Sequence, residues 1–411
     1  MIGLASAWPL LLSVACLVFG TNLQGVLLPV LGLERGSGMT AIGLLSSSWS
    51  AGFVLACLTV GALMRRFGRA GCFALLCTAS ALSSALLLGV RHAPLWWSDP
   101  GWIALRLVIG FCFGGLVTNI ESWLIERSGS GPAFAGYMMV SLLASLAGTL
   151  SLDLVDPAGS APFVLTIASV LLACLPMRLM RAGVSAGPVQ PFRVNPARLF
   201  GLAPLGTGGV LAAGLITGAI GGLGPVFGME EGRTMGSDTL MLAANSVGGA
   251  LAYAPIALLG GRVGRRVLLG GAVVLGLAVC APLIWASLIW PSMPSVSPPW
   301  ATPLRQGRPP ADILIALFGL FGFAQYPVYG LCVGMVNEAA AGRSADQIAS
   351  ELLLLFGLGT VVGPLAAAEI MRAGGNLFAF IAAVLVLLLV GLVADAWRLP
   401  HWTERSRNPT L

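Results

Sequence analysis

The sequence predicts an all-α integral membrane protein whose twelve transmembrane helices form two pseudo-symmetric six-helix bundles. Three observations predict this class: very few charged residues, a regular series of long apolar segments, and an internal repeat. The repeat relates residues 20–70 to a segment 196 positions later, so that Pro29 and Glu34 recur as Pro225 and Glu230. Both copies lie in apolar stretches and end in an arginine-rich loop, which is the pattern of a duplicated membrane bundle.

The composition excludes most other classes. Hydrophobic residues fill 57% of the 411 positions and charged residues only 9%, with a mean hydropathy of +0.91. A soluble protein of this size carries about 25% charged residues, so these few charges cannot cover a water-facing surface. The apolar segments suit helices of about 20 residues and lack the alternation of membrane β-strands. The net charge of +6 comes from arginines in short loops, so we expect no nucleic-acid partner.

Apolar runs between Gly, Pro and charged residues define the elements in order. The first six helices are predicted at about 7–32, 41–64, 70–90, 100–125, 133–155 and 160–181. The second six are predicted at about 203–228, 238–260, 266–290, 311–337, 346–371 and 375–397. We therefore expect an N-terminal bundle at 1–181, a polar cytoplasmic linker at 182–202, and a C-terminal bundle with a short cytoplasmic tail at 203–411. The Pro-rich segment 291–310 is expected to be an exposed loop.

The distribution of arginine predicts the orientation. With both termini in the cytoplasm, 15 arginines lie in inner loops and the tail, six lie outside, and Arg106 lies inside a helix. This excess predicts that both termini are cytoplasmic, in a bacterial inner membrane. The first apolar run begins near Ala7 without a preceding basic residue and is long enough to span, so no cleavable signal peptide is expected.

Two loops resemble a motif of the major facilitator superfamily. The segment from Gly61 to Arg69 reads GALMRRFGR, and its counterpart from Gly261 to Arg266 reads GRVGRR. The superfamily motif has Gly, three residues, and then Asp-Arg-x-Gly-Arg-Arg. Here Arg65 and Gly261 stand where that Asp is usual, so a cytoplasmic latch of the usual kind would need other groups.

Further segments resemble the YcaD-like bacterial branch of this superfamily. The most specific is the Glu-Ser-Trp-Leu block from Glu121 to Leu124. The others are Gly20–Pro29, Gly110–Asn119, Pro327–Glu338 and Leu352–Pro364. Together the segments cover nearly the whole chain. The resemblance implies secondary transport by alternating access, without naming a substrate.

Arg106 is the strongest candidate for a functional residue. A charge near the bilayer centre costs about 3 kcal/mol or more, so an intramembrane arginine is a functional candidate by default. The stretch from Arg106 to Gly110 resembles the Arg-x-x-x-Gly motif of proton-coupled members, which implies proton transfer or binding of an anionic group. The alternative is a snorkelling arginine whose guanidinium reaches the outer surface.

A cytoplasmic gate is expected where the arginine loops meet two carboxylates. Glu121 is either a protonatable coupling group or the partner of Arg65, Arg66 or Arg69, and Glu338 occupies the matching position in the second half. The symmetry suggests two latches that break when the bundle opens inward. The predicted gate comprises Arg65, Arg66, Gly68, Arg69, Glu121, Arg262, Gly264, Arg265, Arg266, Asn337 and Glu338.

Uncharged polar residues in the helices are candidates for substrate contacts. They are Asn22, Gln24, Asn119, Asn245, Gln325, Tyr326 and Tyr329. In the superfamily, helices one, four, seven and ten line the central cavity, and most of these residues lie on them. The alternatives are interhelical hydrogen bonds for the amides and core packing for the tyrosines. Asp153 and Glu369 are expected to be solvated at the membrane interface, and Glu351 to face Arg343 or the linker.

We expect a monomeric secondary transporter that moves a small organic molecule. Proton-coupled export of a metabolite or drug-like compound is the leading expectation. Uptake or facilitated diffusion is one alternative, and a membrane assembly or sensing protein that transports nothing is another. The chain has no phosphate-binding Walker loop, and both histidines lie in loops, so no enzyme activity, cofactor or metal is expected. The expected partners are the substrate, protons and the lipid bilayer.

Overall fold

The computed structural model describes residues 8–90, 95–128, 132–179, 196–230, 235–259, 263–289, 311–339 and 345–407. Within these ranges almost every residue is helical and no strand occurs, so the all-α prediction is confirmed. The Pro-rich segment 291–310 and most of the predicted linker lie outside the described residues.

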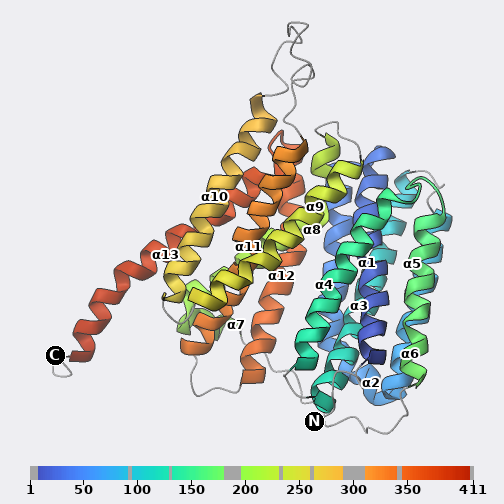
Figure 1. Cartoon of the computed structure of the whole chain (residues 1–411), viewed down its shortest axis with the longest axis horizontal. Helices are drawn as coiled ribbons and strands as arrows, with labels where there is room; N and C mark the ends of the chain where they lie inside the picture. The colour runs from blue at the N-terminus through green and yellow to red at the C-terminus, as the bar shows by residue number, and fades with distance from the viewer. Residues whose placement is uncertain are drawn as a thin grey trace, which may run out of the picture. The chain divides into compact units, whose positions relative to one another are not determined.

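The helices follow the predicted order (Figure 1). The first half contains α1 (Trp8–Glu34), α2 (Met39–Val90), α3 (Leu95–Ser128), α4 (Pro132–Leu150), the short 3₁₀ helix η2 (Ser151–Asp153), α5 (Ala161–Leu172) and α6 (Cys174–Leu179). The second half contains α7 (Pro196–Leu202), α8 (Pro204–Glu230), α9 (Met235–Leu259), α10 (Arg265–Ile289), α11 (Ala311–Ala339), α12 (Ala345–Arg372) and α13 (Leu377–Arg407). The end of the predicted linker is thus helical, in α7.

Helix α2 covers two predicted spans. It is interrupted only at Gly68, whose φ of 70° and ψ of 166° lie outside the helical region. Glycine adopts a positive φ without the steric cost that a side chain brings, so the arginine loop is a sharp break between two packed helical segments. Among the described residues, eight helices are long and apolar enough to span a membrane, and two shorter apolar helices accompany them. The exact count of twelve spans stays a prediction.

The chain forms two compact units whose boundaries lie inside helices. The first unit comprises Met1–Phe192, Gly218–Ala243 and Thr360–Ala373, and the second comprises the remainder. The first unit therefore contains the first-half helices together with parts of α8, α9 and α12. By the predicted orientation, those parts are the outer ends of the three helices. The predicted boundary between two folding domains at 182–202 stays a prediction.

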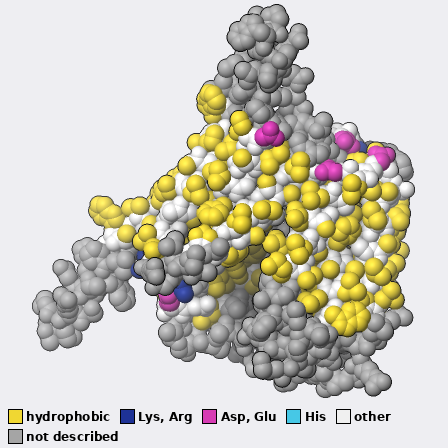
Figure 2. Space-filling view, viewed as in Figure 1, with side chains coloured by type: hydrophobic (Ala, Val, Ile, Leu, Met, Phe, Trp, Pro, Cys, Tyr) yellow, Lys and Arg dark blue, Asp and Glu magenta, His cyan; other side chains and the backbone are white. Residues whose placement is uncertain are grey.

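Apolar side chains both fill and surround the helices. In the first unit, one core cluster gathers around Phe73 and another around Phe163. Many large apolar residues are nevertheless exposed, including Leu82, Leu387 and Trp397. The face in Figure 2 is correspondingly dominated by hydrophobic side chains. Because such a surface is unfavourable in water and favourable against lipid tails, it belongs to an integral membrane protein.

Glycines allow close helix crossings within each unit. In the first unit, a Cβ at Gly52 would meet the backbone of α3 at Leu107, and a Cβ at Gly110 would meet the backbone of α2 at Trp49. In the second unit, a Cβ at Gly248, which lies 196 positions after Gly52, would meet the backbone of α11. Small residues at such crossings let membrane helices approach closely. The close packing fixes the polar side chains that flank each crossing.

Candidate functional site

In the first unit, Arg106 is the centre of a buried polar network. Its side chain is 6% exposed and lies on α3. The Nη1 group donates a hydrogen bond of 3.1 Å to Oε1 of Gln24 on α1. Gln24 Nε2 in turn donates a hydrogen bond of 3.2 Å to Oγ of Ser84 on α2. Through these two hydrogen bonds, Gln24 on α1 links Arg106 on α3 to Ser84 on α2.

Among the described residues, no carboxylate pairs with the charge of Arg106. The guanidinium carbon lies 5.8 Å from the ring centroid of Trp49, at the distance of a cation–π contact. Its Nε has no hydrogen-bond acceptor, and no ion pair joins Arg106 to an acid within the described part of the chain. A snorkelling arginine would expose its head group, whereas this one is held inside the helix bundle.

The backbone determines where this guanidinium can lie. The close crossing of α2 and α3 at Gly52 and Gly110 places Trp49 beside the helix that carries Arg106. On α1, a Cβ added to Gly25 would lie 3.7 Å from Nη2 of Arg106. Because 3.7 Å is an ordinary van der Waals distance, the backbone of α1 at Gly25 lies close beside the guanidinium. Small residues on the neighbouring helices together create the polar site.

The second unit contains a set of uncharged polar residues, here called the second cluster, on α9 and α11, which cross closely where Gly322 meets the backbone of Asn245. It contains Asn245 on α9 and Gln325 on α11, which are 4% and 8% exposed. Within the part of the chain that the structure describes, the Oδ1 atom of Asn245 and the Oε1 atom of Gln325 have no hydrogen-bond donor. Because a buried polar atom without a partner is costly, each is a candidate acceptor for a ligand.

Aromatic side chains accompany these amides. The ring of Tyr326 packs against Gly249 of α9, where a Cβ would overlap it. The ring of Tyr329 meets that of Phe356 on α12 edge to face, with centroids 4.9 Å apart. The cluster therefore combines amide acceptors with aromatic faces, which suits a ligand with both apolar and hydrogen-bonding parts.

Two predicted site residues act as links between helices. Asn22 donates to the carbonyl of Val18 and accepts a hydrogen bond of 2.9 Å from Ser145 Oγ, which joins α1 to α4. Asn119 is fully buried and donates to the carbonyl of Arg69 at 3.0 Å. These contacts match the structural alternative of interhelical hydrogen bonding, but Oδ1 of Asn119 still lacks a donor among the described residues.

At the predicted cytoplasmic gate, Glu121 has a different partner from the expected arginine. Its Oε1 atom accepts a hydrogen bond of 2.7 Å from the hydroxyl of Tyr137 on α4. An ion pair of Glu121 with Arg65, Arg66 or Arg69 is not among the contacts of these described residues, so that expectation is wrong for this conformation. Tyr137 lies one to two turns into α4 and supplies the hydrogen-bond donor instead.

In the second half, the predicted proximity of Glu338 to the arginines is confirmed. Nη1 of Arg265 lies 2.7 Å from Oε1 of Glu338, and Nε of Arg266 lies 2.8 Å from Oδ2 of Asp395. Both pairs join helices of the same sequence half. Asn337 is exposed and Gly264 precedes α10, while Arg262 lies outside the described residues.

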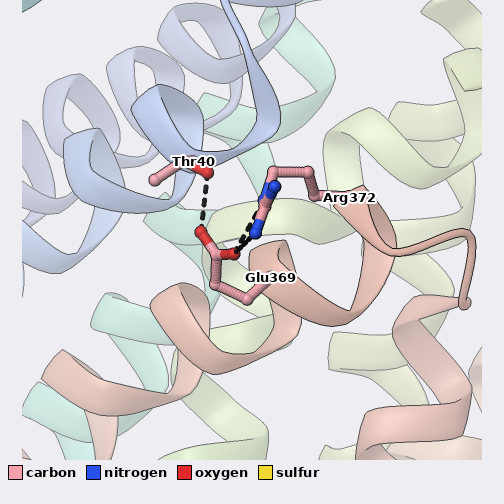
Figure 3. A network of polar contacts seen from close by, with 3 residues as sticks. All are labelled: Thr40, Glu369 and Arg372. Atoms are coloured by element: carbon pink, nitrogen blue, oxygen red, sulfur yellow. Dashed lines mark hydrogen bonds and ion pairs between the residues drawn. The ribbon is translucent and has the colours of Figure 1, made fainter.

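The sequence interpretation missed two carboxylates that make specific contacts. Glu369 accepts a hydrogen bond from Thr40 and pairs with Arg372 (Figure 3). Asp153 accepts a hydrogen bond from Thr239. The sequence predicts both acids to be solvated. Their threonine partners are distant in the sequence. The one sequence feature that points to these pairs is that each threonine lies near the start of a helix, on the same predicted outer face as its acid. Glu351, by contrast, is fully buried in α12.

Among the described residues, no group of three His, Cys, Asp or Glu side chains could hold a metal ion. The two clusters described above comprise a buried guanidinium, amide and hydroxyl groups, and aromatic rings. This arrangement can hold and orient a small molecule or influence a proton.

Comparisons with known proteins agree with the helical architecture. No protein-family model matches the chain. An uncharacterized MFS-type transporter of Enterobacter sp. (strain 638) is 26% identical over 377 residues, which cover 87% of each chain. The uncharacterized MFS-type transporter YcaD of Salmonella arizonae is 24% identical over 410 residues, which cover 95% of each chain.

Transporters are among the solved structures with the same fold. The nucleoside transporter NupG superposes with a TM-score of 0.70 at 12% identity, covering 96% of this chain and 99% of its own. A D-xylose-proton symporter gives a TM-score of 0.62 at 13% identity, covering 95% and 97%. The chain therefore has the fold of the major facilitator superfamily and resembles the YcaD-like bacterial transporters, as its loop and helix motifs predict.

Proposed function

We propose that the protein is a secondary active transporter of a bacterial inner membrane, with both termini in the cytoplasm. It exports a small organic metabolite or drug-like compound by alternating access between two six-helix bundles, and proton movement drives the export. The fold and the relatives named MFS-type transporters support transport as the function class. The symporter among the structural neighbours has proton coupling in its name and supports the choice of driving ion by analogy only.

The buried Arg106 network is the observation that carries proton coupling. A charged guanidinium with an unsatisfied Nε and no carboxylate partner is costly in a low-dielectric interior. Such a group is retained where its charge has a use. Its positive charge favours the release of a proton from a nearby carrier and attracts the anionic part of a ligand.

The uncharged cluster supports the choice of substrate class. Asn245 and Gln325 offer buried acceptors, and Tyr326 and Tyr329 offer aromatic surface. These groups suit an amphipathic or weakly polar compound with hydrogen-bond donors better than they suit a dianion. Uptake by the same carrier is the second candidate, because the geometry of both clusters is neutral with respect to direction.

The test begins with thermal unfolding of the detergent-purified protein across a library of metabolites and drug-like compounds. The proposal expects at least one compound to raise the melting temperature of wild type and to lose this effect with Arg106→Gln. Binding to the folded state stabilises it by mass action, so the shift reports the bound complex. Stable co-purification of a protein partner, with no compound acting on either variant, would favour the non-transporting alternative.

A further inference from the structure

On the predicted outer face, a hydroxyl of α2 contacts a carboxylate of α12. Thr40 Oγ1 donates a hydrogen bond of 2.7 Å to Oε1 of Glu369, and Arg372 holds Oε2 of the same carboxylate at 2.6–2.7 Å (Figure 3). Thr40 and Glu369 are 329 positions apart and belong to different sequence halves. Both nevertheless lie in the first compact unit.

A second contact of the same kind joins α9 to the end of α4. Thr239 is fully buried near the start of α9, and its Oγ1 lies 2.8 Å from both carboxylate oxygens of Asp153 in η2. These residues also come from different sequence halves within the first unit. Leu242, one turn further along α9, packs against the core cluster that contains Leu152.

The two contacts are related by the internal repeat. Thr40 and Thr239 lie one and four residues after the first residues of α2 and α9, Met39 and Met235, which are themselves 196 positions apart. Glu369 follows Asp153 by 216 positions, close to the 217 that separate Glu338 from Glu121. One contact is therefore the pseudo-symmetric counterpart of the other, to within one helical turn.

Close packing lies directly beneath the Thr40 contact. A Cβ at Gly43 of α2 would lie 2.6 Å from Cβ of Ala368 and 3.0 Å from the carbonyl oxygen of Pro364. A Cβ at Gly222 of α8 would lie 2.6 Å from Cβ of Ser46. Ser46 Oγ also donates to the carbonyl of Gly222 at 3.3 Å. The outer ends of α2, α8 and α12 therefore meet without space for a further methyl group.

From this geometry we propose that the Thr40–Glu369 and Thr239–Asp153 pairs are twin latches of an outer gate. Each latch joins a helix of one sequence half to a helix of the other, and the packing at Gly43 and Gly222 forms the seal beneath. Glu369 and Arg372 are 46% and 65% exposed, so water can replace the Thr40 contact when the gate opens. The inference rests on the proposed alternating access, because only a carrier that opens outward must break these contacts.

The test measures how readily a thiol beneath the latch reacts. Ser46→Cys is introduced into detergent-purified protein, and its labelling by a maleimide is followed with and without Thr40→Val plus Thr239→Val. Labelling of the protein with serine at position 46 is subtracted, because eight native cysteines are present. We expect the double valine variant to label about fivefold faster, since two weak contacts are lost. Threonine-to-serine replacements at both positions keep the hydroxyl and should restore the slow rate.

The chain offers a control in the second segment of α2, beyond the break at Gly68. Thr78 is exposed on α2, and its hydroxyl bonds only the carbonyls of Ala74 and Leu75 in its own helix. Thr78→Val should therefore leave the labelling rate unchanged. An unchanged rate in the double valine variant, or an equal increase with Thr78→Val, would overturn the latch assignment.

A second pair of variants tests the seal independently. Gly222→Ala places a methyl group against Ser46, whereas Gly221→Ala, its neighbour on α8, meets nothing within 4 Å. Faster labelling with Gly222→Ala alone is the expected result, and equal labelling in both variants contradicts it. The labelling needs no ligand. Unchanged labelling in a protein that a compound still stabilises would therefore reject the latches while leaving the proposed transport in place.

Discussion

The two buried polar clusters differ in charge and in which kind of hydrogen-bonding atom is left without a partner among the described residues, a guanidinium donor in the first and amide acceptors in the second. In the first unit, Arg106, Gln24 and Ser84 form a connected chain around one positive charge. In the second unit, Asn245 and Gln325 are uncharged and each retains an unpartnered amide oxygen. The difference indicates a division of labour in which the first cluster couples transport to protons and holds the anionic part of a ligand, whereas the second contacts its uncharged part. Mutations should separate the two roles.

Arg106→Met gives the largest expected effect, because it removes the charge that distinguishes the first cluster from the second. Ligand-driven proton flux in proteoliposomes should fall at least about tenfold, while the melting temperature rises, because an apolar residue of similar size replaces an uncompensated buried charge. Arg106→Lys is the control, since it keeps a charge but loses the planar fork. A fall in stability with unchanged flux would identify Arg106 as structural.

Gln24→Leu sharpens the comparison by leaving the charge and removing its acceptor. Nη1 of Arg106 then lacks the only hydrogen-bond acceptor that the described residues give it. The free energy of unfolding should decrease by about 1–3 kcal/mol, the cost of an unsatisfied buried donor. Gln24→Glu should act in the opposite sense, because it supplies a carboxylate. Thermal unfolding of the two variants measures both effects, and equal shifts would argue against the network.

Gln325→Leu and Asn245→Ala test the second cluster. Each removes an acceptor that the protein itself leaves unused, so ligand affinity should fall about tenfold for a lost hydrogen bond. The pH dependence of transport should remain as in wild type, because no charge is involved. Titration of the stabilising compound by fluorescence or calorimetry measures the affinity.

Asn22→Ala is the matched control for the amide variants. Its amide is already used by Val18 and Ser145, so stability should decrease by about 1 kcal/mol without a change in ligand affinity. A loss of affinity as large as that of Gln325→Leu would place Asn22 in the binding site and remove the contrast between the clusters.

Glu338→Gln has the smallest expected effect. Its ion pair with Arg265 joins two helices of the same half, and the side chains are 65% and 41% exposed. Exposed pairs contribute less than about 1 kcal/mol, so stability and transport should both stay close to wild type. A large change in labelling at Ser46→Cys would restore the cytoplasmic latch hypothesis.

The sequence predicts the fold well because membrane helices leave strong local signals. The apolar spans, the repeat and the break at Gly68 depend on residues that are close in the chain. Burial of Arg106 also follows from its apolar neighbours in α3. Its acceptor Gln24 lies 82 positions away, and the choice of that acceptor depends on the glycine crossings, which the sequence alone does not align.

The partners of the carboxylates are harder to predict. Glu121 has several arginines on the neighbouring loop, yet it accepts a hydrogen bond from Tyr137 on the next helix. Asp153 and Glu369 look like ordinary solvated acids, because each threonine partner lies in the other sequence half. A polar contact is determined by which side chains meet after packing, so charge alone does not identify the partner.

The most direct test of coupled transport is ligand-dependent proton flux into proteoliposomes that contain a pH-sensitive dye. The compound that most raises the melting temperature is added to liposomes with wild type, with Arg106→Gln, and with no protein. The proposal predicts that the compound causes proton flux only in the liposomes that contain wild type. Equal flux with Arg106→Gln, or binding of the compound without any proton flux, would contradict the proposal that Arg106 couples transport to protons.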